Sequence, residues 1–475
     1  MLNYFFTYSQ NAYDALLYSY NSSIGTAKLV AMGGSFGALG GEFSSLSINP
    51  AGIGLYQNTE MSITPNFSIN NVKSYYTTPI ESEKKNMNIS NIGVVYSLPL
   101  KNPNWNRFNI AIGGNQLASY NKNIMIEGIN YTNSFADKIL EFSQGKNIQE
   151  LDVLFGEPAW QTFLIDTTIA GDNGEYILNI NSNTKKTQKE IFQSNGSKNE
   201  FSISVGGSMN DNIYIGATIG MPRIRHYSLS KYSEENYEIL NSHIQKFDFH
   251  QESLVSGTGI NIKTGILIRL RESFKIGLAI HSPTLYNMQQ TLNTTLATYT
   301  DTATIPFEFS SEYYVLSEYE MSTPWKGIIS ASTIFENTLI LNIDYEIIDY
   351  SSINIVSDNY NFIDENNDIN NYFEKTNNFR IGTEVHLGNI LTGLNGLLAR
   401  SGYARYGSPY KEKEFTTENF SFGIGANWKS GYFTDIAYIL SQKQDEHLLY
   451  SEDYIDPINI INTDHNIIIT LGVRY

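Results

Sequence analysis

Residues Gly33 to Gly37, reading Gly-Gly-Ser-Phe-Gly, have the spacing of a hydrolase nucleophile elbow. Such an elbow requires a strand before the serine, a helix after it, and an Asp and a His later in the chain. No parallel-strand pattern surrounds Ser35. We therefore interpret the glycines as a flexible backbone segment and expect the protein not to be an enzyme.

Metal-binding residues form no convincing constellation. The seven histidines include no closely spaced pair of the His-Glu-x-x-His type. The acidic run Asp364 to Asp368 has the oxygen-rich look of a calcium loop, but it lacks the central Gly and the distal Glu, so we expect a solvated loop. The chain has no cysteine, which excludes disulfides and thiolate sites. The sequence predicts no metal and no cofactor.

Several cationic side chains share the polar face of apolar–polar alternating segments, where one of them could bind a ligand carboxylate through a charge-assisted hydrogen bond. The alternative is that they pair with inward acidic groups, such as Asp344, Glu346 and Glu384, and we favour it because an enclosed interior must satisfy its charges. The candidate head-group contacts are Lys263, Arg269, Arg271, Lys275 and Arg380.

The alternation that carries these charges is the main structural signal. In residues 201–209 the apolar Phe201, Ile203 and Val205 are separated by serines, and the pattern restarts at Ile213 after the turn-forming Asn-Asp-Asn. The opposite face holds Gly, Ser, Asn and charge rather than a second apolar layer. A soluble sandwich would bury one face of each sheet in a shared core. The alternation fits a membrane barrel better, in which the apolar face of each strand contacts lipid and the polar face lines the interior.

We expect an all-β fold, a transmembrane antiparallel β-barrel of about fourteen strands, each about ten residues long. An apolar stretch near 306–316 is interpreted as loop, which keeps the strand number even. Hydrophobic residues make up 41% of the chain without a run long enough for a membrane helix. The expected strands lie near 60–70, 88–98, 106–118, 200–210, 211–221, 258–270, 273–282, 318–335, 338–349, 377–387, 396–405, 418–428, 431–441 and 465–475.

The links between these strands alternate in length, as in bacterial outer-membrane barrels with short periplasmic turns and long outer loops. This predicts an outer-membrane location with both termini in the periplasm, and surrounding lipid as a partner. Ser134 to Phe142 has helical spacing within the longest loop. The net charge of −17 argues against nucleic-acid binding. The expected long loops are 119–199, 222–257, 283–317, 350–376 and 442–464.

The N-terminal segment does not alternate. Residues 11–56 are rich in Gly, and Pro50 would break a wall strand because it lacks a backbone donor. We expect residues 1–9 to be a signal-peptide remnant, residues 10–56 to form a plug, or hatch, and residues 57–475 to form the barrel.

The stretch from Gly33 to Gly54 resembles the hatch signature of the FadL/TodX outer-membrane transport family, with Asn49, Pro50, Ala51 and Gly52 matching its Asn-Pro-Ala-Gly. The final Tyr475 is similar to the terminal aromatic residue of such barrels. Further segments are similar to wall and loop landmarks of the family's Bacteroidota branch, namely His281–Thr284, Thr323–Trp325, Asp344–Glu346, Asp349–Ser351 and Arg400–Tyr403.

The resemblance implies a channel for passive uptake of hydrophobic small molecules, such as long-chain fatty acids. They would leave a plugged barrel sideways, through a gap at a kinked strand near the hatch. Two outer loops, for which 119–199 and 283–317 are the candidates, would form an apolar capture groove. The alternative is a structural subunit of an outer-membrane secretion or assembly complex, with protein partners.

Overall fold

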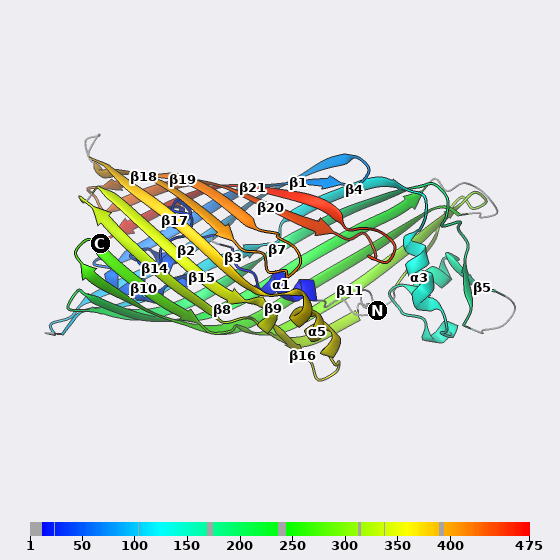
Figure 1. Ribbon diagram of the computed structural model, residues 1–475, viewed down its shortest axis with the longest axis horizontal. Coiled ribbons are helices and arrows are strands. Elements are labelled where there is room, and N and C mark those ends of the chain that lie inside the picture. Colours follow the sequence, from blue (N-terminus) through cyan, green and yellow to red (C-terminus); the bar gives the residue numbers. More distant parts are fainter. Residues whose placement is uncertain are drawn as a thin grey trace.

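The computed structural model describes residues 12–22, 24–102, 104–168, 174–235, 244–311, 315–336, 338–388 and 394–475. The expected signal remnant, residues 1–9, lies outside them. Most of the described chain forms one closed antiparallel barrel, elongated along its axis (Figure 1). Each wall strand pairs with its neighbours, and the last strand pairs with the first, so the sheet has no free edge around this ring.

The described wall has fourteen strands, which confirms the predicted number and class. Four of them are interrupted and therefore carry two labels each: β3 with β4 (Lys122–Asn130), β10 with β11, β14 with β13, and β15 with β16 (Asn354–Val356). The wall strands are β1 (Glu60–Tyr75), β2 (Pro79–Pro99), β3 (Trp105–Ser119), β7 (Lys186–Met209), β8 (Ile213–Glu235), β9 (Ile244–Arg271), β10 (Phe274–His281) with β11 (Leu285–Thr300), β13 (Val315–Ser322) with β14 (Lys326–Phe335), β15 (Leu339–Asp349), β17 (Lys375–Gly388), β18 (Leu394–Tyr406), β19 (Thr417–Trp428), β20 (Tyr432–His447) and β21 (Ile458–Arg474).

The two faces of the wall differ as the alternation predicts. Ile203, Ile219 and Ile262 are exposed on the outside, whereas Ser202 and Thr218 are buried toward the interior. An apolar exterior around a polar interior is the arrangement of a barrel that faces lipid. Among the described residues, no helix is long and apolar enough to cross a membrane.

Several strands run far beyond the predicted ends. β7, β8 and β9 have 24, 23 and 28 residues, so the segment 222–257, predicted as a loop, is mainly strand. The segment 283–317 likewise contains β11. Above the apolar belt the outward positions become polar, as at Arg223 and Thr258, so the apolar stripe ends while the hydrogen-bonded ladder continues.

The predicted strand 318–335 is also wrong in one respect, because it is broken at residues 323–325 between β13 and β14. The stretch near 306–316 holds the short β12 (Phe307–Ser310), which pairs with β11 and adds no member to the ring. The acidic run 364–368, predicted as a solvated loop, lies in helix α5 (Ile363–Tyr372).

Residues 12–56 fold inside the barrel, as expected for a hatch, and are mostly buried. Their elements are α1 (Ala12–Ser19), α2 (Ala27–Ala31) and two short 3-10 helices, η1 (Phe43–Ser47) and η2 (Pro50–Leu55). In Figure 1, α1 lies near the middle of the long axis. The position of the N-terminus itself lies outside the described residues, so its predicted location stays a prediction.

The long segment between β3 and β7 forms a compact subdomain at the barrel end opposite the C-terminus (Figure 1). Its predicted helix is confirmed as α3, which carries a capping box at Ser134 and Asp137. Phe135 and Ile139 of α3 pack against Phe249 of β9 and Tyr450 of the β20–β21 link. β4 (Lys122–Asn130) still belongs to the wall, because it continues β3 along β7. The elements of the subdomain are α3 (Phe135–Ser143), η3 (Ile148–Glu150), α4 (Gly156–Gln161), β5 (Ile165–Thr167) and β6 (Tyr176–Leu178); η4 (Tyr350–Ser352) and β16 (Asn354–Val356) follow β15.

Candidate functional site

The hatch backbone rests directly on glycines of the wall. A methyl group on Gly216 of β8 would overlap the Pro50 carbonyl, and one on Gly277 of β10 would overlap the Gly37 carbonyl. Such close backbone approach requires residues without a Cβ. The inward glycines that the alternation places on the polar face are therefore hatch contacts. They include Gly93, Gly113, Gly206, Gly216, Gly265, Gly277, Gly382, Gly402 and Gly423.

Polar side chains of the wall also satisfy backbone groups of the hatch. The Asp344 carboxylate of β15 accepts hydrogen bonds from the Phe36 and Gly37 amides at 3.0 and 3.1 Å. The Lys275 ammonium of β10 donates to the Leu39 carbonyl at 2.9 Å. On the opposite wall, the Thr470 hydroxyl accepts from the Ala27 amide at 2.7 Å. The hatch is thus bonded to strands around the ring.

The Asn-Pro-Ala-Gly segment forms the start of η2. The Asn49 side chain caps this helix by accepting from the Ala51 amide at 3.1 Å, and its amide nitrogen donates to the Gly37 carbonyl at 2.6 Å. Pro50 occupies the first turn, where a missing N–H costs nothing. A Cβ on Gly52 would stand 3.0 Å from the Gly40 Cα. The motif therefore joins two turns of the hatch.

A cavity of ≈ 90 Å³ lies between the hatch and the rest of the interior. Its lining carries six charged side chains beside polar residues and apolar ones such as Ile48 and Leu117. Lys263 pairs with Glu200, and Glu346 pairs with Lys326 and Arg380 at 3.4 and 3.3 Å. Lys198 forms no ion pair within the described part of the chain. Its ammonium donates instead to the backbone carbonyls of Tyr18 and Tyr20, at 2.7 Å each.

The five predicted cations divide into groups. Lys263 and Arg380 line the cavity, and both are engaged by carboxylates. Lys275 is buried beneath it, against the hatch. Arg269 stacks on the Tyr214 ring, 5.6 Å from its centroid, and Arg271 is exposed at the end of β9, so neither reaches the cavity.

Sequence reasoning missed Lys198, Glu200 and Lys326, which share the lining with the predicted residues. Lys198 and Glu200 continue the inward alternation of β7, but Lys198 lies beyond the predicted start of that strand. Lys326 follows the break that sequence analysis did not place. The alternation would have found all three if the strand ends had been known.

The wall beside the cavity is incompletely laddered. The β2–β3 ladder ends at the pair Asn91 and Asn115, and the upper part of β2, residues 79–90, pairs only with β1 within the described chain. The Asn88 amide reaches Gln116 across this interval, which we call the β2–β3 seam. Asn115 and Leu117 line the cavity, so the cavity extends to the seam.

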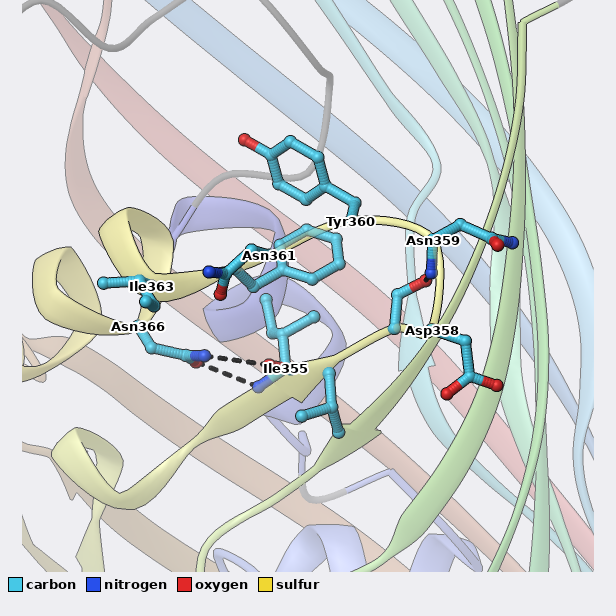
Figure 2. A pocket seen from close by; sticks show the side chains of 10 residues that line it. Ile355, Asp358, Asn359, Tyr360, Asn361, Ile363 and Asn366 are labelled. Carbon is cyan, nitrogen blue, oxygen red and sulfur yellow. Dashed lines mark hydrogen bonds between the residues drawn. The ribbon is translucent and has the colours of Figure 1, made fainter.

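An apolar layer that includes α1 of the hatch borders the cavity. Leu16 and Tyr18 of α1 pack there with Phe362, Ile369 and Phe373 of the α5 region. A surface pocket of ≈ 540 Å³ lies on the other side of this region, between β16 and the start of α5 (Figure 2). The Asn366 side chain bonds both backbone groups of Ile355 there, at 2.8 and 2.9 Å, and fixes its shape (Figure 2).

The two segments predicted to form a capture groove meet at the barrel end that carries the α3 subdomain. Phe163 of the 119–199 segment and Phe307 of the 283–317 segment form an edge-on ring contact, with centroids 5.3 Å apart. Both rings are substantially exposed, and Ile305 beside them is 77% exposed. Phe163 has a positive φ of 60°, which is strained for an aromatic residue. We interpret this exposed apolar contact at a strained backbone position as a candidate interaction site.

Comparison with solved structures identifies the fold. The chain is similar to a FadL homologue of Pseudomonas aeruginosa (TM-score 0.53, 12% identity, covering 96% of this chain and 99% of that one). It is similar to the Pseudomonas putida toluene transporter TodX (TM-score 0.53, 10% identity, 96% and 98% covered). It is also similar to the CymD monoaromatic hydrocarbon channel (TM-score 0.51, 11% identity, 96% and 99% covered).

The sequence matches no protein-family model and no curated protein. At these identities the structural likeness establishes the FadL/TodX fold across nearly the full chain. The predicted Bacteroidota lineage stays a prediction.

Proposed function

We propose that this protein is an outer-membrane channel that takes up hydrophobic or amphipathic small molecules and releases them sideways into the membrane. The observation that carries the proposal is the hatch seated on its ring of wall glycines, with a cavity above it that extends to the β2–β3 seam. A hatch that is hydrogen-bonded to strands around the ring blocks passage along the barrel axis. A molecule in the cavity then has the seam as its nearest exit.

The short strand connections support a periplasmic position for the C-terminal end. The links after β7, β9 and β19 are short, and Tyr475 bonds to Thr59 at the same end of the barrel. Short turns lie on the periplasmic side in barrels of this kind. The α3 subdomain and the Phe163–Phe307 contact then face the outside, where an apolar molecule would first bind.

The charged cavity favours an amphipathic ligand over a plain hydrocarbon. TodX and CymD are named for toluene and monoaromatic hydrocarbons, which carry no charge. Here Lys198, Lys263, Lys326 and Arg380 outnumber Glu200 and Glu346 in the lining. A carboxylate could accept hydrogen bonds from Lys198 while its acyl chain lies along the apolar layer of α1. This chemistry is that of a long-chain fatty acid.

A role as a structural subunit is the second candidate. The long strands β7, β8 and β9 extend well past the apolar belt and present a broad polar surface to the outside. Such a surface would suit protein partners, and mild-detergent purification would test for a stable co-purifying set. A purely structural role does not require a cavity beside an unpaired part of the wall, so we favour the channel.

Uptake by intact cells tests the proposed function. A strain lacking the protein is compared with one expressing it, using a radiolabelled long-chain fatty acid and a hydrophilic sugar of similar mass. We expect expression to raise fatty-acid uptake and leave sugar uptake unchanged. Equal fatty-acid uptake in both strains, or accelerated passage of the sugar, would contradict the proposal.

A further inference from the structure

A second break in the wall faces the same cavity from another side. β10 ends at His281, which pairs with Lys326, and β11 begins at Leu285, which pairs with Ser322. Between these two pairs, residues 282–284 of one strand face residues 323–325 of the next without ladder pairing. We call this interval the proline seam, because each side contains a proline.

Proline explains why the ladder fails here. Pro283 and Pro324 have no N–H, so neither can donate to the neighbouring strand. Among the described residues, two hydrogen bonds cross the seam, and both join Thr284 and Thr323. The Thr284 amide donates to the Thr323 hydroxyl at 2.9 Å, and the Thr323 amide donates to the Thr284 carbonyl at 3.1 Å.

The break extends to the next strand along the ring. β15 ends at Asp349 and its continuation β16 begins at Asn354, at the level where β13 and β14 separate. β9, on the other side, runs through without interruption and bonds Ser282 through the Ile262 carbonyl at 2.9 Å. The interruption is therefore local to three neighbouring strands and does not arise from a strand end.

The chemistry changes sharply across the proline seam. On the inside, Ser282, Thr284 and Thr323 line the charged cavity, with Lys326 and Arg380 near them. On the outside, Leu285 and Trp325 are each 62% exposed, and Ile280 is 58% exposed. The next outward residues, Asn287 and Glu320, are polar, so the seam lies at the upper boundary of the apolar belt.

We propose that the proline seam admits an anionic single-chain lipid directly from the outer leaflet into the cavity. The charged head group would enter between residues 282–284 and 323–325 and reach Lys326 and Arg380, while the acyl chain remains against Leu285 and Trp325 in the bilayer. A polar cavity behind a lipid-exposed break matches an amphiphile in this orientation. The proposal rests on the proposed channel function and adds a membrane entrance to it.

Because the chain contains no native cysteine, two introduced cysteines can form a disulfide only with each other. The variant Thr284→Cys/Thr323→Cys places a disulfide across the proline seam, and Asn287→Cys/Glu320→Cys places one at a laddered pair of the same two strands. The full-length protein is reconstituted in phospholipid vesicles that contain a diazirine-bearing palmitic acid. Irradiation followed by mass spectrometry then measures the labelling of peptides around Lys326 and Arg380.

We expect the oxidised 284–323 lock to abolish cavity labelling, a reductant to restore it, and the oxidised 287–320 control to leave it unchanged. If the double variant does not fold, Thr284→Cys alkylated with a bulky maleimide provides the same block. Persistent labelling with the seam locked would overturn the proposal.

Two further outcomes separate this proposal from the proposed function. Loss of labelling with the variant Asn88→Cys/Gln116→Cys alone, which closes the β2–β3 seam, would reject the proline seam and leave the channel intact. No cavity labelling in the unmodified protein would count against the channel function itself.

Discussion

Gly402 of β18 lies so close to Gly33 of the hatch that a methyl carbon on Gly402 would stand 2.7 Å from the Gly33 Cα. Gly33 itself has a φ of +64°, a backbone conformation that residues with a side chain rarely adopt. Backbone therefore meets backbone at this point, and the contact leaves no room for a molecule to pass. The same relation recurs around the ring, at Gly216 and Pro50 among others.

Replacing Gly402 by alanine tests whether this fit holds the hatch. Gly402→Ala should displace the hatch locally and cost about 1–3 kcal/mol, as overpacking of a tight contact does. Ionic conductance across a planar bilayer should rise. Gly327→Ala is the matched control, because a Cβ there meets nothing within 4 Å. Equal conductance of the two variants would show that the hatch does not depend on the glycine contact.

Asn49 should contribute more to the stability of the hatch than an asparagine in an exposed turn does. Asn49→Ala removes the cap of η2 and the bond to the Gly37 carbonyl, and should destabilise the hatch by about 1–3 kcal/mol. Hydrogen exchange of the amides in residues 36–55 measures the effect. Asn102→Ala removes a similar cap at an exposed turn and should leave that exchange unchanged. The prediction fails if both variants exchange alike.

Arg400 holds two inward carboxylates together. Its guanidinium donates to Glu384 at 2.6 Å and to Asp435 at 2.5 Å, and all three side chains are buried. Arg400→Leu would remove the buried ion pairs of both carboxylates, leaving Glu384 with only its contact to His386 at 3.2 Å, and should cost about 3–5 kcal/mol. Heat-modifiability on a gel gives the unfolding temperature. Arg405→Leu, on the exposed side of the same strand, should have little effect; an equal loss there would contradict the assignment.

Glu42 should make hatch docking depend on pH. Burial raises the pKa of this hatch carboxyl from 4.5 to about 7, against the opposing effect of hydrogen bonds from Thr26 and the Ser44 amide. Between pH 4.5 and about 7 the docked hatch therefore binds more protons than the undocked one. Docking should weaken as the pH rises through this window and level off above it.

Amide exchange of residues 43–47 between pH 4 and pH 8, corrected for the intrinsic rate, measures this dependence. Glu42→Gln lacks the titrating group and should give a flat profile. A slope that persists in Glu42→Gln would assign the dependence to another group.

The barrel could be predicted from the sequence because outward-facing strand residues contact lipid and are therefore apolar at every second position. Ile203, Ile219 and Ile262 lie outside, and their polar neighbours lie inside, as the alternation requires. The hatch was also predictable, because residues 11–56 lack the alternation of the wall strands. Gly and Pro content alone would not have sufficed, since the wall strands also contain glycines, Pro65 and Pro222. Strand ends were not, because residues such as Arg223 and Thr258 lie above the belt and carry no apolar signal.

The site was predicted only in part, for a different physical reason. Lys263 and Arg380 were found because inward charge on a wall strand is conspicuous. Lys263 and Arg380 pair with Glu200 and Glu346, which lie 63 and 34 residues away in the chain. Only the pairing of neighbouring strands brings these groups together. The β2–β3 seam is an absence of pairing between neighbouring strands, which no local pattern indicates. Pro283 and Pro324 of the proline seam are visible in the sequence, but the sequence does not show that they face each other across the wall.

A reversible lock on the β2–β3 seam tests the central claim most directly. The variant Asn88→Cys/Gln116→Cys, expressed in cells that lack the native protein, closes the wall where the cavity meets it. Fatty-acid uptake should stop when the pair is oxidised and recover on reduction, while the reduced protein behaves as the unmodified one. Undiminished uptake through the oxidised protein would contradict lateral release at this seam.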